Sequence, residues 1–283
     1  MSAPDAPITA PAAADAGDGA RPGFVEIADL SFSYPGADRP ALEDVNLSVA
    51  AGEFVCILGP SGCGKSTLLN IISRLAVPSH GTVSVGGEVI VGDHGVVDRG
   101  STAIGYVFQD ARLLPWRTVR QNIDLVLKAA DVPSEEWESR VDRYLRLCDI
   151  AQFADSWPGN LSGGQRQRAA IARALAIEPS LVLMDEPFST LDEVTARFLR
   201  GELLEIWART GRTIIFITHS IREAVFLADR IYVMSAGPGT VIDDITVPVP
   251  RPRRYEDPAL TELEGEIVSS VLGHWGYEDR VGA

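Results

Sequence analysis

One short stretch of the chain combines glycines, a lysine and hydroxyl groups at a spacing suited to phosphate chemistry. Glycines leave the backbone free to wrap closely around a polyphosphate, with its N–H groups pointing inward. Lys65 would supply a mobile positive charge for the β- and γ-phosphates, and the Ser66 hydroxyl would ligate Mg²⁺. The residue types therefore predict a nucleoside triphosphate site. The stretch reads Gly59, Pro60, Ser61, Gly62, Cys63, Gly64, Lys65, Ser66 and Thr67.

The residues on either side of this stretch predict the elements that hold it. The apolar run 53–58 is typical of a buried strand, and residues 68–73 are typical of a helix. The pattern Gly-x-x-x-x-Gly-Lys-Ser/Thr between a strand and a helix is the phosphate-binding P-loop in its usual context. Because the helix begins near Lys65, the positive end of its dipole would also face the phosphates.

Two further strands are predicted to end in polar side chains that such a site needs. The apolar run 181–184 is followed by Asp185 and Glu186. In P-loop enzymes the first acid holds Mg²⁺, usually through water, and the second can polarise an attacking water. The alternative for such a pair is a solvated loop. The apolar run 213–218 ends at His219, which is either structural or a contact for the γ-phosphate.

Two other features point to a nucleotide with less specificity. Tyr34 lies ahead of the P-loop, where an aromatic ring can stack on adenine, although it is equally an ordinary strand-end aromatic. A Ser-Gly-Gly turn opens a helix rich in arginine and alanine. Such a turn offers a hydroxyl, free backbone N–H groups and a helix dipole to an anion. The turn consists of Leu161, Ser162, Gly163, Gly164 and Gln165.

The order of elements predicts an α/β core with an antiparallel annex. Strands alternate with helices, and hairpins are expected over residues 24–49 and 81–91, the second turning at Gly86-Gly87. Residues 109–178 hold no strong strand and predict a helical insert. We expect a disordered tail over 1–23, a nucleotide-binding domain over 24–245 and a C-terminal extension over 246–283. Arg251, Arg253 and Arg254 in that extension are interpreted most simply as a solvated face, the alternative being a contact with phospholipid head groups or a partner. An amphipathic helix is expected over 260–272.

Bulk composition excludes several classes of function. The chain has 283 residues, 46% of them apolar, which is enough for a sizeable core. A net charge of −14 and a pI of about 4.7 argue against a nucleic-acid partner. The three cysteines are widely spaced and predict neither a disulfide framework nor a zinc site. No apolar run is long enough to cross a membrane and no signal peptide is evident, so work at a membrane would need other chains.

Taken together and in order, these motifs resemble the nucleotide-binding subunit of an ABC transporter. The Leu-Ser-Gly-Gly-Gln signature defines that family more sharply than a P-loop does. The resemblance covers about residues 24–245 and implies a P-loop NTPase fold, with a RecA-like mixed sheet, an antiparallel β annex and a helical insert. Matching positions are Tyr34 for the A-loop, 59–67 for Walker A, Gln109 for the Q-loop, 161–165 for the signature, 181–186 for Walker B, Asp192 for the D-loop and His219 for the switch.

This resemblance implies an ATPase with ATP and Mg²⁺ as cofactors. Glu186, His219 and Gln109 would be catalytic, whereas Tyr34, residues 59–67, residues 161–165 and Asp192 would bind the nucleotide. Ser66, Gln109 and Asp185 would hold the metal. Because ATP in this family is sandwiched between Walker A of one subunit and the signature of another, the resemblance implies a homodimer with two composite sites.

A finer resemblance follows Gln109. The run 111–119, with Leu-Leu-Pro-Trp at 113–116, is similar to importer ATPases of the nitrate/sulfonate/taurine group, although Gln165 stands where that group often has Met. It implies permease subunits as partners, an extracytoplasmic binding protein acting indirectly, and a peripheral position on the cytoplasmic face of the membrane. Its structural alternative is a Pro-Trp turn packed into the helical insert. The alternative functions are a soluble ABC ATPase of repair or translation, and an exporter cassette.

Overall fold

The computed structural model describes residues 21–97 and 102–275, and its contacts divide the chain into two compact units. Unit 1 comprises residues 1–97 and 215–283, and unit 2 comprises residues 98–214. Most of the tail expected over 1–23 lies outside the described residues. The helical block expected over 109–178 falls wholly within unit 2.

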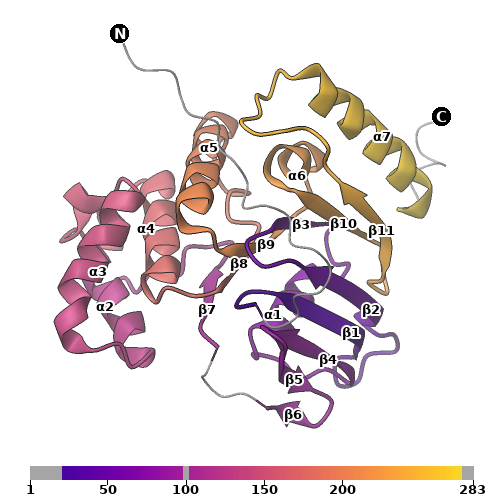
Figure 1. Ribbon diagram of the computed structural model, residues 1–283, viewed down its shortest axis with the longest axis horizontal. Helices are drawn as coiled ribbons and strands as arrows, with labels where there is room; N and C mark the ends of the chain where they lie inside the picture. Colours follow the sequence, from indigo (N-terminus) through magenta and orange to yellow (C-terminus); the bar gives the residue numbers. More distant parts are fainter. Residues whose placement is uncertain (1–20, 98–101, 276–283) are drawn as a thin grey trace. The chain divides into compact units, whose positions relative to one another are not determined.

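Unit 1 contains an antiparallel sheet with the strand order β2-β1-β4-β5-β6 (Figure 1). Alternation buries Val25 and Ile27 and exposes Glu26, as the sequence predicts for a half-buried strand. The expected Gly86-Gly87 turn is confirmed, and both glycines have the positive φ that a tight hairpin requires. The strands are β1 (Val25–Phe32), β2 (Leu42–Val49), β4 (His80–Val85), β5 (Glu88–Gly92) and β6 (Gly95–Val96).

A second sheet in unit 1 carries the P-loop. Its order is β11-β10-β3-β9, and β10 is parallel to β3 but antiparallel to β11. All five residues of β3 are buried, as expected for a strand covered on both faces. The elements are β3 (Phe54–Leu58), β9 (Thr213–Thr218, of which 215–218 belong to this unit), β10 (Arg230–Met234), β11 (Val241–Thr246), α1 (Lys65–Ile72) and α6 (Ile221–Leu227).

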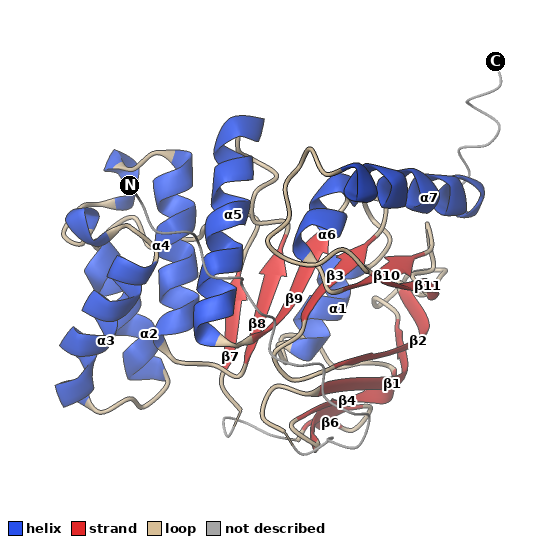
Figure 2. Ribbon diagram, turned by 45° about the horizontal axis from the view of Figure 1, so that its top comes forward, coloured by secondary structure: helices blue, strands red, loops and turns tan. Residues whose placement is uncertain are grey.

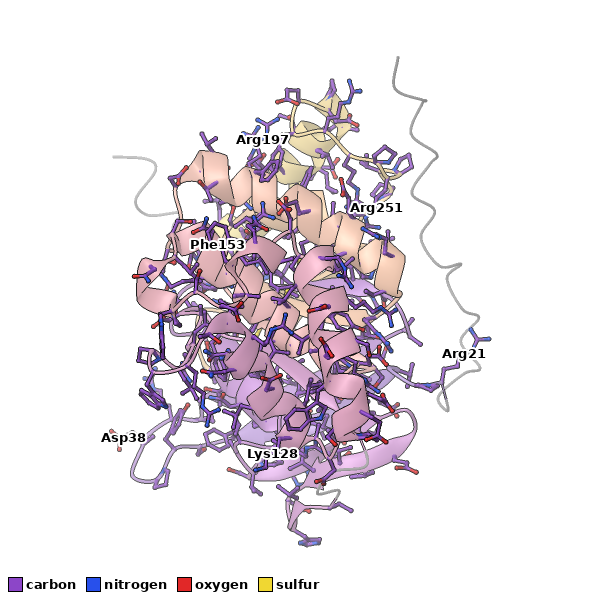
Figure 3. The ribbon with its side chains drawn as sticks, turned by 90° about the vertical axis from the view of Figure 1, so that its left-hand side faces the viewer. Arg21, Asp38, Lys128, Phe153, Arg197 and Arg251 are labelled. Carbon is purple, nitrogen blue, oxygen red and sulfur yellow. The ribbon has the colours of Figure 1, made fainter. Side chains whose placement is uncertain are left out.

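The chain then crosses to α7 (Pro258–His274), which packs beside α6 (Figures 1 and 2). Leu260, Leu263, Ile267 and Val271 form its buried stripe, so the expected amphipathic helix is confirmed. The expectation of a solvated arginine face is wrong for two of its three members. The Arg253 side chain is buried and donates to the Val225 and Ala228 carbonyls at the end of α6. Arg251, labelled in Figure 3, is also buried, and only Arg254 is exposed.

Unit 2 contains a parallel pair of strands and four α-helices in its described residues. The strands are β7 (Ile104–Val107) and β8 (Leu181–Asp185). A Cβ on Gly105 of β7 would stand 2.7 Å from the Ala174 carbonyl oxygen of α4, so this glycine allows the helix to lie close against the strand. The helices are α2 (Val119–Ala129, ending beside Lys128 in Figure 3), α3 (Ser134–Leu147), α4 (Gly163–Ala176) and α5 (Glu193–Thr210).

Two helix starts in unit 2 are fixed by their flanking residues. Pro133 is the N-cap of α3, and Ser134 is the first helical residue. Helix α4 begins at Gly163, so both glycines of the Ser-Gly-Gly turn are helical and Ser162 is the cap. The side chains of Ser162 and Gln165 satisfy each other's backbone N–H group at this start.

Candidate nucleotide-binding and hydrolysis site

In unit 1 the P-loop has the backbone that its glycines predicted. Gly62 and Gly64 have φ values of 83° and 103°, in the region that L side chains rarely adopt. A Cβ on Gly64 would also stand 2.6 Å from the Ala41 carbonyl oxygen. The Lys65 ammonium donates to the carbonyls of Gly59 and Pro60 at 2.7 and 2.9 Å, which holds its charge against the loop. The loop therefore has both the glycine backbone and the lysine charge that a phosphate-binding loop needs.

Cys63 lies in the middle of this loop but turns its side chain inward. It is 1% exposed, and a Cβ added to Gly59 would stand 2.8 Å from its sulfur. Cys63 can therefore contact a nucleotide through its backbone only. Cys56 and Cys148 are buried as well, and none of the three cysteines forms a disulfide. Burial raises the pKa of the Cys148 thiol to about 12.

Tyr34 is joined directly to the helix that follows the P-loop. Its hydroxyl and the Thr67 Oγ1 are 2.8 Å apart, and its ring makes an edge-to-face contact with Phe32 at 4.9 Å. The Tyr34 side chain is 51% exposed, so one part of its ring is open to solvent beside the loop. The sequence suggested a shared site only from the position of Tyr34 ahead of the P-loop, and the structure brings the Tyr34 ring next to Thr67 at the end of that loop.

His219 occupies the junction between β9 and α6, and its side chain is exposed. The Ser220 N–H donates to Thr218 Oγ1 at 2.9 Å, and Ser220 Oγ caps α6 by accepting from the Glu223 N–H. These bonds fix the backbone on the C-terminal side of His219. Helix α6 has no counterpart in our sequence-based prediction, because it is short. Its signal was the Ser-x-x-Glu pattern of Ser220 and Glu223.

In unit 2 the two predicted acids lie at the end of β8, with Asp185 as its last residue and Glu186 directly after it, and Glu186 has a strained backbone. Its φ is +42°, which costs a residue other than glycine about 1–3 kcal/mol. Both the N–H and the hydroxyl of Ser189 donate to the Glu186 carbonyl, at 3.2 and 2.9 Å. Such strain persists where the surrounding structure holds it, and it is found most often at functional sites.

Gln109 is brought to the same place. Its side-chain nitrogen donates to Ser189 Oγ at 3.1 Å, so Ser189 joins Gln109 to the backbone of Glu186. This bond leaves the amide oxygen of Gln109 as the atom that can meet a metal. Ser66 belongs to unit 1, whereas Gln109 and Asp185 belong to unit 2. Their hydroxyl, amide oxygen and carboxylate are the hard oxygen donors that Mg²⁺ prefers, so the chemistry of each predicted ligand fits the cation, and a metal site that they share stays a prediction.

The predicted signature forms the N-terminus of α4. Ser162 Oγ accepts the Gln165 N–H at 3.2 Å, and the Gln165 side-chain oxygen accepts the Ser162 N–H at 2.8 Å. This reciprocal pair is a capping box, so Gln165 has a structural use at the position where the resemblance is weakest. Cβ atoms on Gly163 and Gly164 would lie 2.9 Å from Leu191 and 3.1 Å from Thr195. Both glycines thus permit close packing against the start of α5.

Asp192, predicted as a nucleotide contact in the D-loop, is the N-cap of α5. Its carboxylate accepts the Thr195 N–H at 3.0 Å, and this hydrogen bond lowers the pKa of Asp192 below its usual 3.8. Asp192 therefore orients the helix that touches the signature glycines. A direct contact with nucleotide stays a prediction.

Residues that the sequence reasoning missed build the segment around 111–119. Asn122 is 1% exposed and bonds four backbone groups: its oxygen accepts the Leu114 N–H at 2.7 Å, and its nitrogen donates to the carbonyls of Leu114, Arg117 and Thr118. Arg173 of α4 donates to the carbonyls of Ala111 and Arg112. The Leu-Leu-Pro-Trp run was visible here, but nothing local indicated that Asn122 and Arg173 would hold it from two helices.

This segment borders a largely apolar cavity of about 310 Å³. The cavity lies between β7, α2 and α4, and the Arg112 guanidinium lies 4.2 Å from the centre of the Phe108 ring at its wall. The expected alternative, a Pro-Trp turn packed into the helices, does not hold for Trp116, whose side chain is 68% exposed. The motif thus places the basic group of Arg112 at the wall of an apolar cavity and leaves the aromatic side chain of Trp116 exposed.

Comparison with known proteins decides the family to which these motifs belong. Residues 42–189 match the family described as ABC transporter. The chain belongs to this family. It is 40% identical to the nitrate import ATP-binding protein NrtD of Synechococcus elongatus, over 91% of this chain and 94% of that protein. It is 41% identical to the bicarbonate transport ATP-binding protein CmpD of Synechocystis sp., over 90% of this chain and 92% of that protein.

Solved structures of the ABC family have the same fold. The post-hydrolysis dimer of the ATP-binding cassette MJ0796 bound to ADP and Pi aligns with a TM-score of 0.68 and 33% identity, over 80% of this chain and 99% of that chain. The cassette cbiO1 of Clostridium perfringens aligns with a TM-score of 0.71 and 28% identity. The expected P-loop NTPase fold, the ATPase activity and the role as ATP-hydrolysing subunit of an import system are confirmed. No helix among the described residues is long and apolar enough to span a membrane.

Proposed function

We propose that two copies of this chain bind ATP between the Walker A loop of one and the signature turn of the other, and drive import of a small anion through separate permeases. The observation that carries the proposal is the signature turn itself. Ser162 and the first-turn N–H groups of α4 form a second phosphate-binding end in a chain that already has a complete P-loop. Because the chain has one P-loop and one signature turn, a second copy is needed for a P-loop and a signature turn to bind the same nucleotide from opposite sides.

Catalysis in this proposal is electrostatic positioning. The P-loop amides and Lys65 hold the β- and γ-phosphates, and Tyr34 presents its ring to adenine. Bound Mg²⁺ neutralises phosphate charge. Ser66 and Asp185 would hold it together with the Gln109 amide oxygen. Glu186 accepts a proton from the attacking water, and His219 contacts the γ-phosphate.

The permease is proposed to dock on unit 2 at segment 111–119 and the adjacent cavity. The cavity is largely apolar, Arg112 of the segment adds a positive charge at its wall, and Trp116 of the same segment is exposed. These properties suit a helix that offers one apolar side chain and an acidic group. Gln109 lies just ahead of this segment, so it would report the state of the nucleotide to the permease. This arrangement keeps the chain at the cytoplasmic face of the membrane.

The solute is proposed to be a small oxyanion. The relatives named for nitrate import and bicarbonate transport match over nine-tenths of this chain, and the run 113–116 is similar to the nitrate/sulfonate/taurine group. An extracytoplasmic binding protein would choose among these anions. Uptake of labelled nitrate, taurine and bicarbonate into vesicles with the cognate permease tests this, and uptake that needs no binding protein would exclude an importer.

The substitution Glu186→Gln tests the hydrolytic half of the proposal. The variant should bind ATP, lose measurable turnover and accumulate as a dimer, which light scattering during size-exclusion chromatography would detect. Glu193→Gln is the matched control, since Glu193 is an exposed acid in the first turn of α5 whose partner is Arg200. It should keep normal turnover. Unchanged hydrolysis by Glu186→Gln would remove Glu186 from the role of base.

A further inference from the structure

The segment that follows β11 bonds two residues that in turn contact the two ends of the P-loop strand, although it belongs to none of the nucleotide motifs. This segment, residues 250–275, comprises the buried Arg251 and Arg253, helix α7 and Trp275. Figures 1 and 2 show α7 lying beside α6 in unit 1. Each attachment can be followed residue by residue.

The first attachment is at the start of β3. Asp229 pairs with the backbone of Phe54, accepting its N–H at 3.0 Å through Oδ2 and donating its own N–H to the Phe54 carbonyl at 2.7 Å. The other carboxylate oxygen of Asp229 is bonded by the Arg251 guanidinium, which also donates to the Leu227 carbonyl. Arg251 therefore holds the Asp229 carboxylate in place, and this carboxylate in turn holds Phe54, the first residue of the strand.

The second attachment is at the other end of β3. The Trp275 indole N–H donates to the Met234 carbonyl at 2.9 Å. Met234 follows Val233, which is the partner of Leu58 in the parallel register, so Met234 lies beside Gly59. A Cβ on Gly59 would stand only 3.2 Å from the Cβ of Met234. Gly59 is in turn the residue whose carbonyl accepts the Lys65 ammonium.

The loop after Met234 continues this contact under the P-loop. A Cβ on Gly239 would stand 2.1 Å from the Cys63 carbonyl oxygen and 2.8 Å from the Met234 methyl group. There is no room for the loop 235–240 to shift without moving the P-loop backbone. A displacement of Met234 would therefore displace the P-loop residues that would bind phosphate.

We propose that residues 250–275 position the P-loop by holding β3 at both ends, with Arg251 and Trp275 as positioning residues for nucleotide binding. Neither side chain touches the nucleotide. Arg251 acts through Asp229 on Phe54, and Trp275 acts through Met234 on Gly59 and Lys65. The extension is therefore part of the nucleotide-binding machinery rather than an appendage to it.

The test is Trp275→Phe, which keeps an aromatic ring but loses the donated N–H together with the five-membered ring that carries it. Ser270→Ala is the matched control, since Ser270 lies on the same helix and bonds Asp243 of β11, away from the P-loop. Mg·ADP affinity of the full chain is measured by titration calorimetry, well below the melting temperature of each variant. Loss of one hydrogen bond should weaken binding about three- to tenfold in Trp275→Phe and by less than about twofold in Ser270→Ala.

Equal affinities in the two variants would overturn the proposal. Arg251→Lys provides an independent measurement at the other end of the strand, because it keeps the charge but loses the fork that joins Asp229 to Leu227. Hydrogen exchange of the peptides over residues 54–66 should be faster in Arg251→Lys than in Ser270→Ala, and exchange no faster than in the control would also overturn it. Both readouts report ADP binding or backbone protection, so they are independent of whether the chain drives import.

Discussion

Ser162 has two separable tasks, and a short series of substitutions distinguishes them. Its hydroxyl caps α4 through a 3.2 Å bond to the Gln165 N–H, and in the proposed dimer it meets a phosphate of the nucleotide on the twin. Ser162→Ala removes both. Because the Gln165 side chain still accepts the backbone N–H of residue 162, the loss of stability should be at the lower end for a cap, about 0.5–1 kcal/mol.

Ser162→Asp retains the cap, since a carboxylate accepts the same N–H and favours the helix dipole. It also brings a negative charge to the position proposed for a phosphate. We expect its free energy of unfolding to equal that of the wild type or exceed it, while ATP hydrolysis is abolished. Ser162→Ala should hydrolyse about ten- to a hundredfold more slowly, as expected for one lost hydrogen bond to a charged group.

The assays are urea unfolding and phosphate release measured over a range of protein concentrations. In the wild type the rate per chain should rise with concentration as dimers form. If Ser162→Asp hydrolyses ATP at the wild-type rate, or if the wild-type rate per chain is independent of concentration, the two-subunit site is refuted.

Four further outcomes follow from the described contacts. Gly64→Ala should abolish nucleotide binding, because the positive φ costs about 1–2 kcal/mol before the new Cβ meets the Ala41 carbonyl; ATP titration checks it. Asn122→Ala should destabilise the chain by about 2–4 kcal/mol in urea unfolding, since buried groups of the 114–118 backbone lose their partner, whereas Gln121→Ala costs less than about 1 kcal/mol. The three buried thiols should resist a bulky disulfide reagent at mildly alkaline pH and react upon unfolding, and rapid native labelling would contradict the raised pKa of Cys56 and Cys148. Because the pKa of Asp192 is lowered, its cap stabilises α5 at neutral pH and fades as the pH falls through that pKa, so the stability difference between wild type and Asp192→Ala should shrink below pH 3.8.

Strong periodicity and obligatory backbone chemistry made most of the fold predictable. The continuous apolar run of β3, the alternation in β1 and the Gly-Gly hairpin each allowed one interpretation, and each is confirmed. The P-loop was equally clear, because positive φ at Gly62 and Gly64 requires glycine.

What the sequence did not reveal depends on partners that are distant along the chain. Arg251 and Arg253 looked like surface charges, and only the carbonyls at the end of α6 and the Asp229 carboxylate make their burial possible. Asn122 gave no local signal, because its four bonds are made to a loop whose path was unknown. The capping roles of Asp192 and Gln165 were hidden behind the functional roles implied by family resemblance.

Helix α4 begins at the signature turn, and Arg173 and Ala174 in its last turn line the apolar cavity together with its C-cap, Ile177. Its 14 residues span about 20 Å, and Gly105 lets β7 lie against its far end. A close-packed helix of that length is a stiff rod. A tilt imposed at the proposed phosphate contact with the second copy would therefore reach the end proposed to face the permease almost undiminished, with no need for a chain of small rearrangements along the way.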